Sequence, residues 1–147
     1  MERNPHSHRL RLGRYSEAGR LYLVTTVTRQ RRPVFQSLPA ARCLIQTLRR
    51  EQNRGRADTL AFVVMPDHLH WLLELKGAAA LSSVVQAVKS VTAHRLGGLV
   101  WQPGFHDHAL RREEDIAQIA RYVVANPLRS GLVSRLGDYP HWYAIWL

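Results

Sequence analysis

Residues 59–75 read TLAFVVMPDHLHWLLEL, in which two apolar runs are joined by a Pro-Asp pair. The runs, 59–65 and 68–75, are rich in β-branched and bulky apolar side chains, which favour strands. Pro66 and Asp67 are typical of a tight turn. The stretch therefore predicts two antiparallel strands joined as a hairpin.

On the N-terminal side of this hairpin the sequence predicts one strand and one helix. Residues 21–28, LYLVTTVT, have the composition of a strand. Residues 39–53 predict a helix, because Leu44, Ile45 and Leu48 recur at helical spacing with charged residues opposite. We expect this helix to cross from the first strand to the hairpin.

On the C-terminal side the pattern predicts two more helices and one more strand. A helix capped by Ser82 or Ser83 is expected to run to residue 96, before two glycines. A fourth strand is expected within residues 100–111. Residues 112–126 begin with acidic residues, continue with apolar residues at helical spacing, and end before a proline, which predicts a third helix.

The order strand-helix-strand-strand-helix-strand, followed by one helix, is typical of an α+β, ferredoxin-like antiparallel sheet with helices on one face. With 46% hydrophobic residues, 147 residues are enough for one domain with an ordinary core. We expect a single domain over residues 1–147, with a basic N-terminal segment at 1–20 and a C-terminal tail at 130–147. The pattern does not indicate where the last helix packs on the sheet.

The charge of the chain is its first functional signal. Twenty-one Lys and Arg against eleven Asp and Glu give a net charge of +10, and nearly all the cations are arginine. Arginine binds phosphate through two parallel hydrogen bonds, so we expect a nucleic-acid partner. A solubilising surface is the alternative interpretation of clusters such as 29–32 and 48–56.

The cysteine content and the hydropathy of the chain argue against an internal disulfide, a signal peptide and a membrane span. The single Cys43 cannot form an internal disulfide, which fits a reducing cytoplasm. The polar, basic N-terminus lacks the apolar core of a signal peptide, and no apolar run approaches the ~20 residues needed to cross a membrane. We expect a cytoplasmic protein with no membrane association.

Two histidines in the second strand of the hairpin are candidate metal ligands. Side chains alternate along a strand, so His68 and His70 lie on one face and offer two nitrogens to a divalent ion. Taken alone, the pair is better explained as ordinary hydrogen-bonding histidines on a half-exposed sheet, and His106 and His108 repeat the spacing. Asp67 is either an acceptor that orients an imidazole or simply a turn residue.

Tyr122 and Asn126 are four residues apart in the last predicted helix and therefore share one helix face. A phenol is a competent nucleophile and an amide oxygen a competent ligand for a hard cation. The alternative is structural, with Tyr122 at the edge of the core and Asn126 at the helix end. Spacing alone does not choose between them.

Three segments, VVMPDHLHWLL, WQPGFHDHALRREED and ARYVVANPLRSGLV, resemble in order and spacing the REP-associated tyrosine transposases, a branch of the single-tyrosine HUH endonucleases. The resemblance covers residues 13–147. It implies that His68, His70 and Asn126 bind Mg²⁺ or Mn²⁺ and that Tyr122 attacks DNA. It further implies a 5′-phosphotyrosine intermediate and a free 3′-hydroxyl.

The resemblance also implies a substrate, single-stranded DNA beside a REP-type hairpin, in the bacterial cytoplasm at the nucleoid. In the family an arginine-rich N-terminal segment contacts DNA, and here it contains Arg9, Arg11, Arg14 and Tyr15. A disordered basic tail is the alternative. Lys89, in the second predicted helix, is a further candidate phosphate contact. We expect a monomer.

The chain departs from the family at Tyr143, where many relatives carry an acidic residue, so the role of the C-terminal tail stays open. No other tyrosine has a metal-binding partner four residues on, which leaves Tyr122 as the predicted nucleophile. Two other functions remain as alternatives. One is a non-catalytic nucleic-acid binding module, although the sequence has no RNP-type motif, and the other is a metal-dependent nuclease that uses water.

Overall fold

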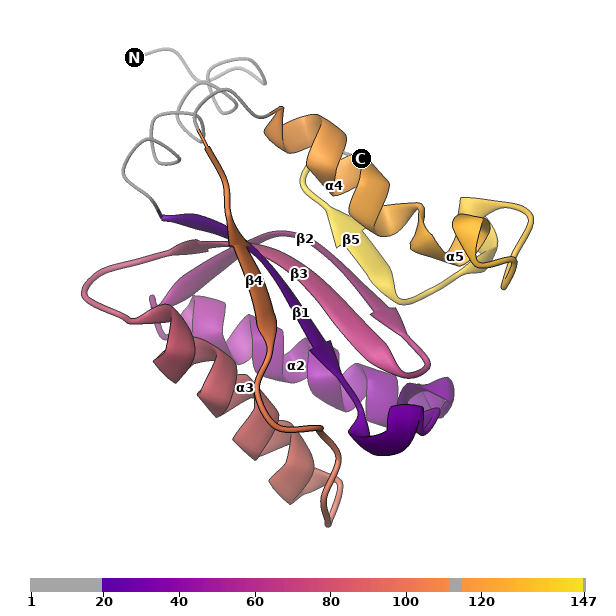
Figure 1. Ribbon diagram of the computed structural model, residues 1–147, viewed down its shortest axis with the longest axis horizontal. Helices are drawn as coiled ribbons and strands as arrows, with labels where there is room; N and C mark the ends of the chain where they lie inside the picture. The colour runs from indigo at the N-terminus through magenta and orange to yellow at the C-terminus, as the bar shows by residue number, and fades with distance from the viewer. Residues whose placement is uncertain (1–19, 112–114, 147) are drawn as a thin grey trace.

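The computed structural model of the chain describes residues 20–111 and 115–146. In this part a five-stranded sheet is covered by helices on both faces (Figure 1). In chain order the strands and helices are β1 (Leu21–Val27), η1 (Arg29–Arg31), η2 (Val34–Gln36), α2 (Leu38–Asn53), β2 (Ala57–Met65), β3 (His68–Leu75), α3 (Leu81–Arg95), β4 (His106–Ala109), α4 (Ile116–Val124), α5 (Asn126–Arg129), η3 (Leu136–Asp138) and β5 (Trp142–Ala144). The four predicted DNA contacts of the N-terminal segment, Arg9, Arg11, Arg14 and Tyr15, lie outside the described residues.

The strands lie in the order β4-β1-β3-β2-β5, and every neighbouring pair is antiparallel. Without β5, this is the order of a ferredoxin-like sheet, so the predicted α+β fold is confirmed. The predicted hairpin is β2-β3, with Met65 opposite His68 and Val63 opposite His70. The histidine pair therefore lies in the centre of the sheet, near the end of its hairpin.

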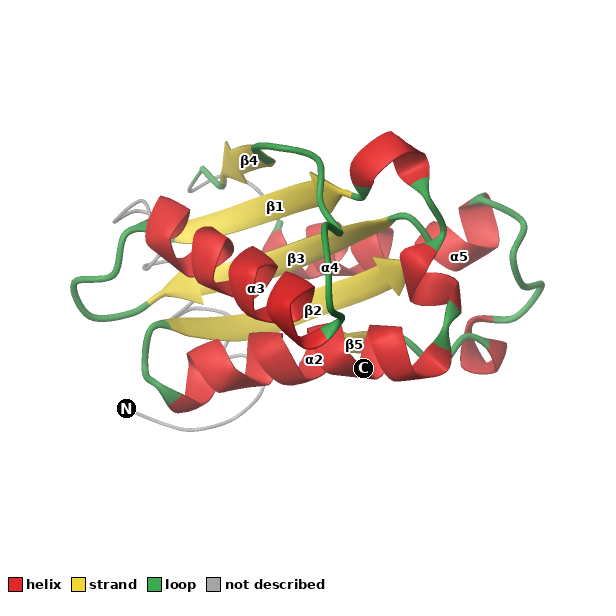
Figure 2. Ribbon diagram, turned by 90° about the horizontal axis from the view of Figure 1, so that it is seen from below, coloured by secondary structure: helices red, strands yellow, loops and turns green. Residues whose placement is uncertain are grey.

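Each face of the sheet has its own core. Helices α2 and α3 cover one face, where Leu69, Trp71 and Leu73 of β3 are buried. Helix α4, which the sequence did not place, covers the opposite face and packs with Leu72. Figure 2 shows the three helices divided in this way between the two sides of the sheet. Because side chains alternate along β3, His68 and His70 lie on the α4 side with Leu72.

Two predicted helix boundaries were wrong. Helix α3 begins at Leu81 with Ala80 at the N-cap and no side-chain cap, so neither Ser82 nor Ser83 caps it. Helix α4 begins after Asp115, whose Oδ1 accepts the backbone N–H of Gln118 at 3.1 Å.

The predicted third helix is divided into two at its C-terminal end. Helix α4 stops at Val124, and Asn126 opens the short helix α5. Pro127 explains the break, because it has no N–H to donate to the carbonyl of Val123. Tyr122 and Asn126 therefore lie on successive helices, which corrects the prediction that one helix carries both.

The C-terminal tail adds a strand that the sequence did not predict. In β5, Trp142, Tyr143 and Ala144 pair with β2 at the edge of the sheet. The ring of Tyr143 stacks on that of Phe62, with centroids 6.1 Å apart. Within the described residues, no helix combines the length and the apolar character that a membrane span requires.

Candidate active site

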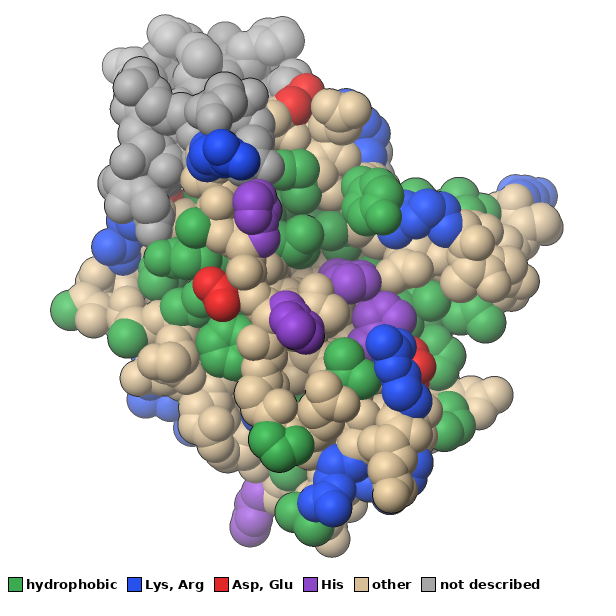
Figure 3. Space-filling view, in the orientation of Figure 1, with side chains coloured by type: hydrophobic (Ala, Val, Ile, Leu, Met, Phe, Trp, Pro, Cys, Tyr) green, Lys and Arg blue, Asp and Glu red, His purple; other side chains and the backbone are tan. Residues whose placement is uncertain are grey.

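His68 and His70 form the centre of the candidate site. Their ring centroids lie 4.8 Å apart with the planes at 79°. Val63, Thr25 and His106 occupy the same cross-strand row as His70, on β2, β1 and β4. Histidine side chains gather accordingly on this face of the molecule (Figure 3). The face is thus rich in groups that bind metal ions or phosphate.

Both rings are oriented through their Nδ1 atoms. His68 Nδ1 lies 2.7 Å from Asp67 Oδ1, and His70 Nδ1 lies 2.8 Å from Thr25 Oγ1. A carboxylate only accepts, so Asp67 holds the proton of His68 on Nδ1 and leaves the lone pair on Nε2. Of the two interpretations of Asp67, the structure supports the orienting acceptor, since this contact is characteristic of metal-binding histidines.

Asp67 is itself held by Arg31, whose Nη1 donates to Asp67 Oδ2 at 3.2 Å. Burial acts to raise the pKa of Asp67, but the hydrogen bonds from His68 and Arg31 outweigh it and lower that pKa below its ordinary value. Gln30 and Arg31 both have positive φ, 54° and 56°. This conformation costs an L-residue roughly 1–2 kcal/mol, so the turn that carries Arg31 is strained.

His70 is electrostatically suited to remain neutral. Burial is the main cause that lowers the pKa of His70 to about 4, and electrostatic contributions from His68, Arg129 and Arg31 act in the same direction. Its imidazole is therefore uncharged near neutral pH and has a lone pair available for a metal ion.

Asn126 meets the histidine pair from the other side. Its Nδ2 lies 3.3 Å from His68 Nε2. Asn126 opens α5, and the end of α4 just before it is held on β2 by the packing of Val123 against Val63 and Met65. The oxygen and nitrogen of a side-chain amide are interchangeable by rotation, so the amide oxygen can take this position.

The structure thus brings together the three predicted ligands, two imidazoles and an amide, and this set fits a divalent ion. Across residues 20–111 and 115–146, no group of three His, Cys, Asp or Glu side chains is arranged to hold one. With its oxygen turned toward His68, the amide of Asn126 would add a third ligand to the two imidazoles.

Tyr122 lies on the exposed side of α4, with 64% of its surface accessible. The guanidinium carbon of Arg129 lies 3.7 Å from the centroid of its ring. Two other tyrosines, Tyr139 and Tyr143, lie in different surroundings. The hydroxyl of Tyr139 donates to the carbonyl of Val64, and burial raises the pKa of this phenol.

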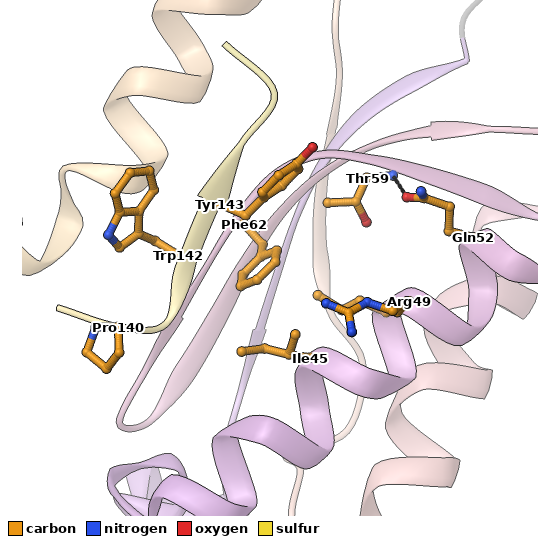
Figure 4. Close-up of a pocket in the computed structure, with 9 residues that line it drawn as sticks. Ile45, Arg49, Gln52, Thr59, Phe62, Pro140, Trp142 and Tyr143 are labelled. Carbon is orange, nitrogen blue, oxygen red and sulfur yellow. Dashed lines mark hydrogen bonds between the residues drawn. The ribbon is translucent and has the colours of Figure 1, made fainter. Parts of the chain in front are cut away.

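Tyr143 lies on the other face of the sheet, at a groove of about 440 Å³ between α2 and β5. Figure 4 shows this groove, with Phe62 beside Tyr143 and with Ile45 and Arg49 of α2 on the opposite side. It contains none of the predicted site residues, so it is separate from the histidine face.

The predicted phosphate contact Lys89 is largely buried, and burial lowers its pKa. Its Nζ donates to the carbonyls of Gln102 and Gly104 at 2.9 and 2.6 Å, which fastens the loop before β4 to α3. Contact with DNA stays a prediction for this residue.

Sequence reasoning did not single out Thr25, Arg31 or Arg129, although Arg31 belongs to the basic run 29–32 and Arg129 to the NPLR segment.

Comparisons with known proteins identify the family to which the fold and the sequence correspond. The profile of the family described as "Transposase IS200 like" matches residues 20–126. A REP-associated tyrosine transposase of Escherichia coli K12 is 34% identical over 82 residues, which cover 54% of this chain and 50% of that protein. The chain thus spans about half the length of that curated relative.

A solved structure of a REP-associated tyrosine transposase bound to a REP hairpin matches with a TM-score of 0.74 and 27% identity. The match covers 84% of this chain and 76% of that one. The resemblance expected from the three sequence segments is therefore confirmed.

Proposed function

The chain belongs to the IS200-like transposase family, and from this premise we propose that it cuts and rejoins single-stranded DNA with Tyr122 as the nucleophile. The family makes it a DNA-processing enzyme. The observation that carries the finer proposal is the 3.3 Å approach of Asn126 to His68. It brings the helix with Tyr122 to the histidine face within one chain.

A divalent ion, Mg²⁺ or Mn²⁺, held by His68, His70 and Asn126 would polarise the scissile phosphate and stabilise charge on the departing oxygen. The protein's own part is to orient these ligands. Asp67 and Thr25 hold the two rings, and Arg31 holds Asp67.

In the proposed reaction, the phenolic oxygen of Tyr122 forms a new bond to phosphorus. This oxygen loses its proton to water as it attacks. The bond from phosphorus to the 3′ oxygen breaks, and that oxygen leaves as a hydroxyl after taking up a proton. The 5′ phosphate is then joined to Tyr122 with its ester energy retained, so attack by another 3′-hydroxyl rejoins DNA without an external energy source.

We propose as substrate single-stranded DNA beside a REP-type hairpin, because a related transposase was solved with a REP hairpin. Arg9, Arg11, Arg14 and Tyr15 would contact the DNA through phosphates and base stacking. Lys89 is kept as a further proposed phosphate contact.

Covalent capture tests the proposed function. A single-stranded oligonucleotide with a REP-type hairpin is labelled at its 3′ or its 5′ end, incubated with protein and Mn²⁺, and denatured. We expect the 3′ label to stay on the protein and the 5′ label to appear on a free fragment. Cutting without an adduct would identify a hydrolytic nuclease, and binding without cutting would identify a binding module.

We expect each chain to work as a monomer with a complete site. Mixing His68→Ala protein with Tyr122→Phe protein should therefore leave cleavage as low as in either variant alone. The measurement is adduct formation at several mixing ratios, with a wild-type dilution series as the control. Cleavage that rises in the mixture would show sites shared between subunits.

Removing the carboxylate of Asp67 should weaken metal binding without removing a ligand. We expect Asp67→Ala to raise the Mn²⁺ concentration needed for half-maximal cleavage by about 10- to 100-fold, because the ring of His68 loses its acceptor. Asp67→Asn keeps an acceptor for His68, so its half-maximal Mn²⁺ concentration should lie between those of the wild type and Asp67→Ala. Asp107→Ala, an exposed aspartate on β4, is the matched control. An unchanged Mn²⁺ dependence would contradict the orienting role.

A further inference from the structure

Arg129 holds Tyr122 at two points. Its guanidinium carbon lies 3.7 Å from the centroid of the phenol ring, well within the range of a cation–π contact. The Nη1 of the same group donates to the backbone carbonyl of Tyr122 at 2.5 Å. One planar group thus contacts both the ring and the backbone of the proposed nucleophile.

The local fold makes this contact possible. Pro127 breaks the helix after α4, and the tight turn of α5, Asn126–Arg129, returns Arg129 toward the last turns of α4. Tyr122 and Arg129 are seven residues apart in sequence, and both are exposed. Among the carboxylates that the structure describes, none forms an ion pair with Arg129.

The exposure of Tyr122 explains why such a contact matters. With 64% of its surface accessible, the side chain is not fixed by core packing. An exposed side chain samples several rotamers, and a nucleophile must stay in the one that faces the phosphate.

We propose that Arg129 is a positioning residue, which holds the ring of Tyr122 in the orientation from which its oxygen attacks DNA. This inference rests on the proposed function of Tyr122. It predicts that loss of the guanidinium slows the chemical step much more than it weakens DNA binding.

A structural role is the competing explanation, because the same hydrogen bond helps to satisfy a carbonyl in the last turn of α4. Such a role would lower thermal stability and would not depend on a stacked planar cation. For a variant that lacks the guanidinium, the two explanations therefore predict different adduct rates, different thermal stabilities and different responses to added guanidinium.

The test is single-turnover adduct formation with saturating 3′-labelled hairpin oligonucleotide and Mn²⁺, together with the Kd for DNA and the Tm. We expect Arg129→Ala to form the adduct at least about 10-fold more slowly, with a Kd within about 3-fold of wild type. Arg121→Ala removes an exposed arginine of α4 and should keep the wild-type rate. Ethylguanidinium at millimolar concentration should partly restore Arg129→Ala, whereas ethylammonium at equal ionic strength should not.

Outcomes against the inference are equally distinct. A wild-type rate in Arg129→Ala, or a rate loss matched by the loss of binding, would overturn it while leaving the proposed function intact. Absence of an adduct in wild-type protein would overturn both. If Arg129→Ala does not fold, the adduct rate of Arg129→Lys tests the inference instead. A folded lysine variant with a slow adduct supports the need for a stacked planar group, and a wild-type rate rejects it.

Discussion

Replacing Tyr122 by phenylalanine is expected to abolish the covalent protein–DNA adduct and to leave DNA binding near its wild-type level. The substitution removes only the phenolic oxygen, which the proposed reaction joins to phosphorus. The ring and its contact with Arg129 are kept. Because the side chain is exposed, the free energy of unfolding should change by no more than about 0.5 kcal/mol.

The measurement is the amount of 3′-labelled DNA that stays on denatured protein. Tyr143→Phe is the matched control, since it removes the same atom from an exposed tyrosine on the other face of the sheet. Peptide mapping of the wild-type adduct should place the nucleotide within residues 120–129. An undiminished adduct in Tyr122→Phe, or a nucleotide on Tyr139 or Tyr143, would show that the assigned nucleophile is wrong.

The second large effect is expected from the histidine pair. His68→Ala or His70→Ala should lower cleavage by about 10³-fold or more, because the loss of a ligand removes several kcal/mol of charge stabilisation from the transition state. DNA binding should persist, since we expect it to depend chiefly on contacts between arginine and phosphate. The measurements are the single-turnover rate across a Mn²⁺ titration and the Kd for the hairpin oligonucleotide.

His106→Ala is the control for this pair, because His106 is exposed and lies in the same cross-strand row as His70. Thermal unfolding must accompany the assay of His70→Ala, which also loses the contact with Thr25. Wild-type cleavage by both ligand variants would reject the metal site.

Local patterns were sufficient for the main elements of the fold. The two apolar runs and the Pro-Asp turn within residues 59–75 predicted the hairpin. The alternation of side chains along a strand placed His68 and His70 on one face, because it depends only on neighbouring residues. Helical spacing likewise predicted α2. It also predicted that Tyr122 and Asn126 share one face of a single helix, which was wrong because Pro127 divides that helix into two.

The sequence by itself therefore determined the ferredoxin-like order of elements, the family, and the residue types of the candidate site. Only the tertiary structure decided that α4 packs on the histidine face, that Trp142–Ala144 forms an edge strand on β2, and that Arg31 reaches Asp67. These contacts join segments far apart in the chain, and no local periodicity encodes such pairing. Arg129 is near Tyr122 in sequence, yet its contact also depends on a change of direction at a helix break, which spacing alone does not specify.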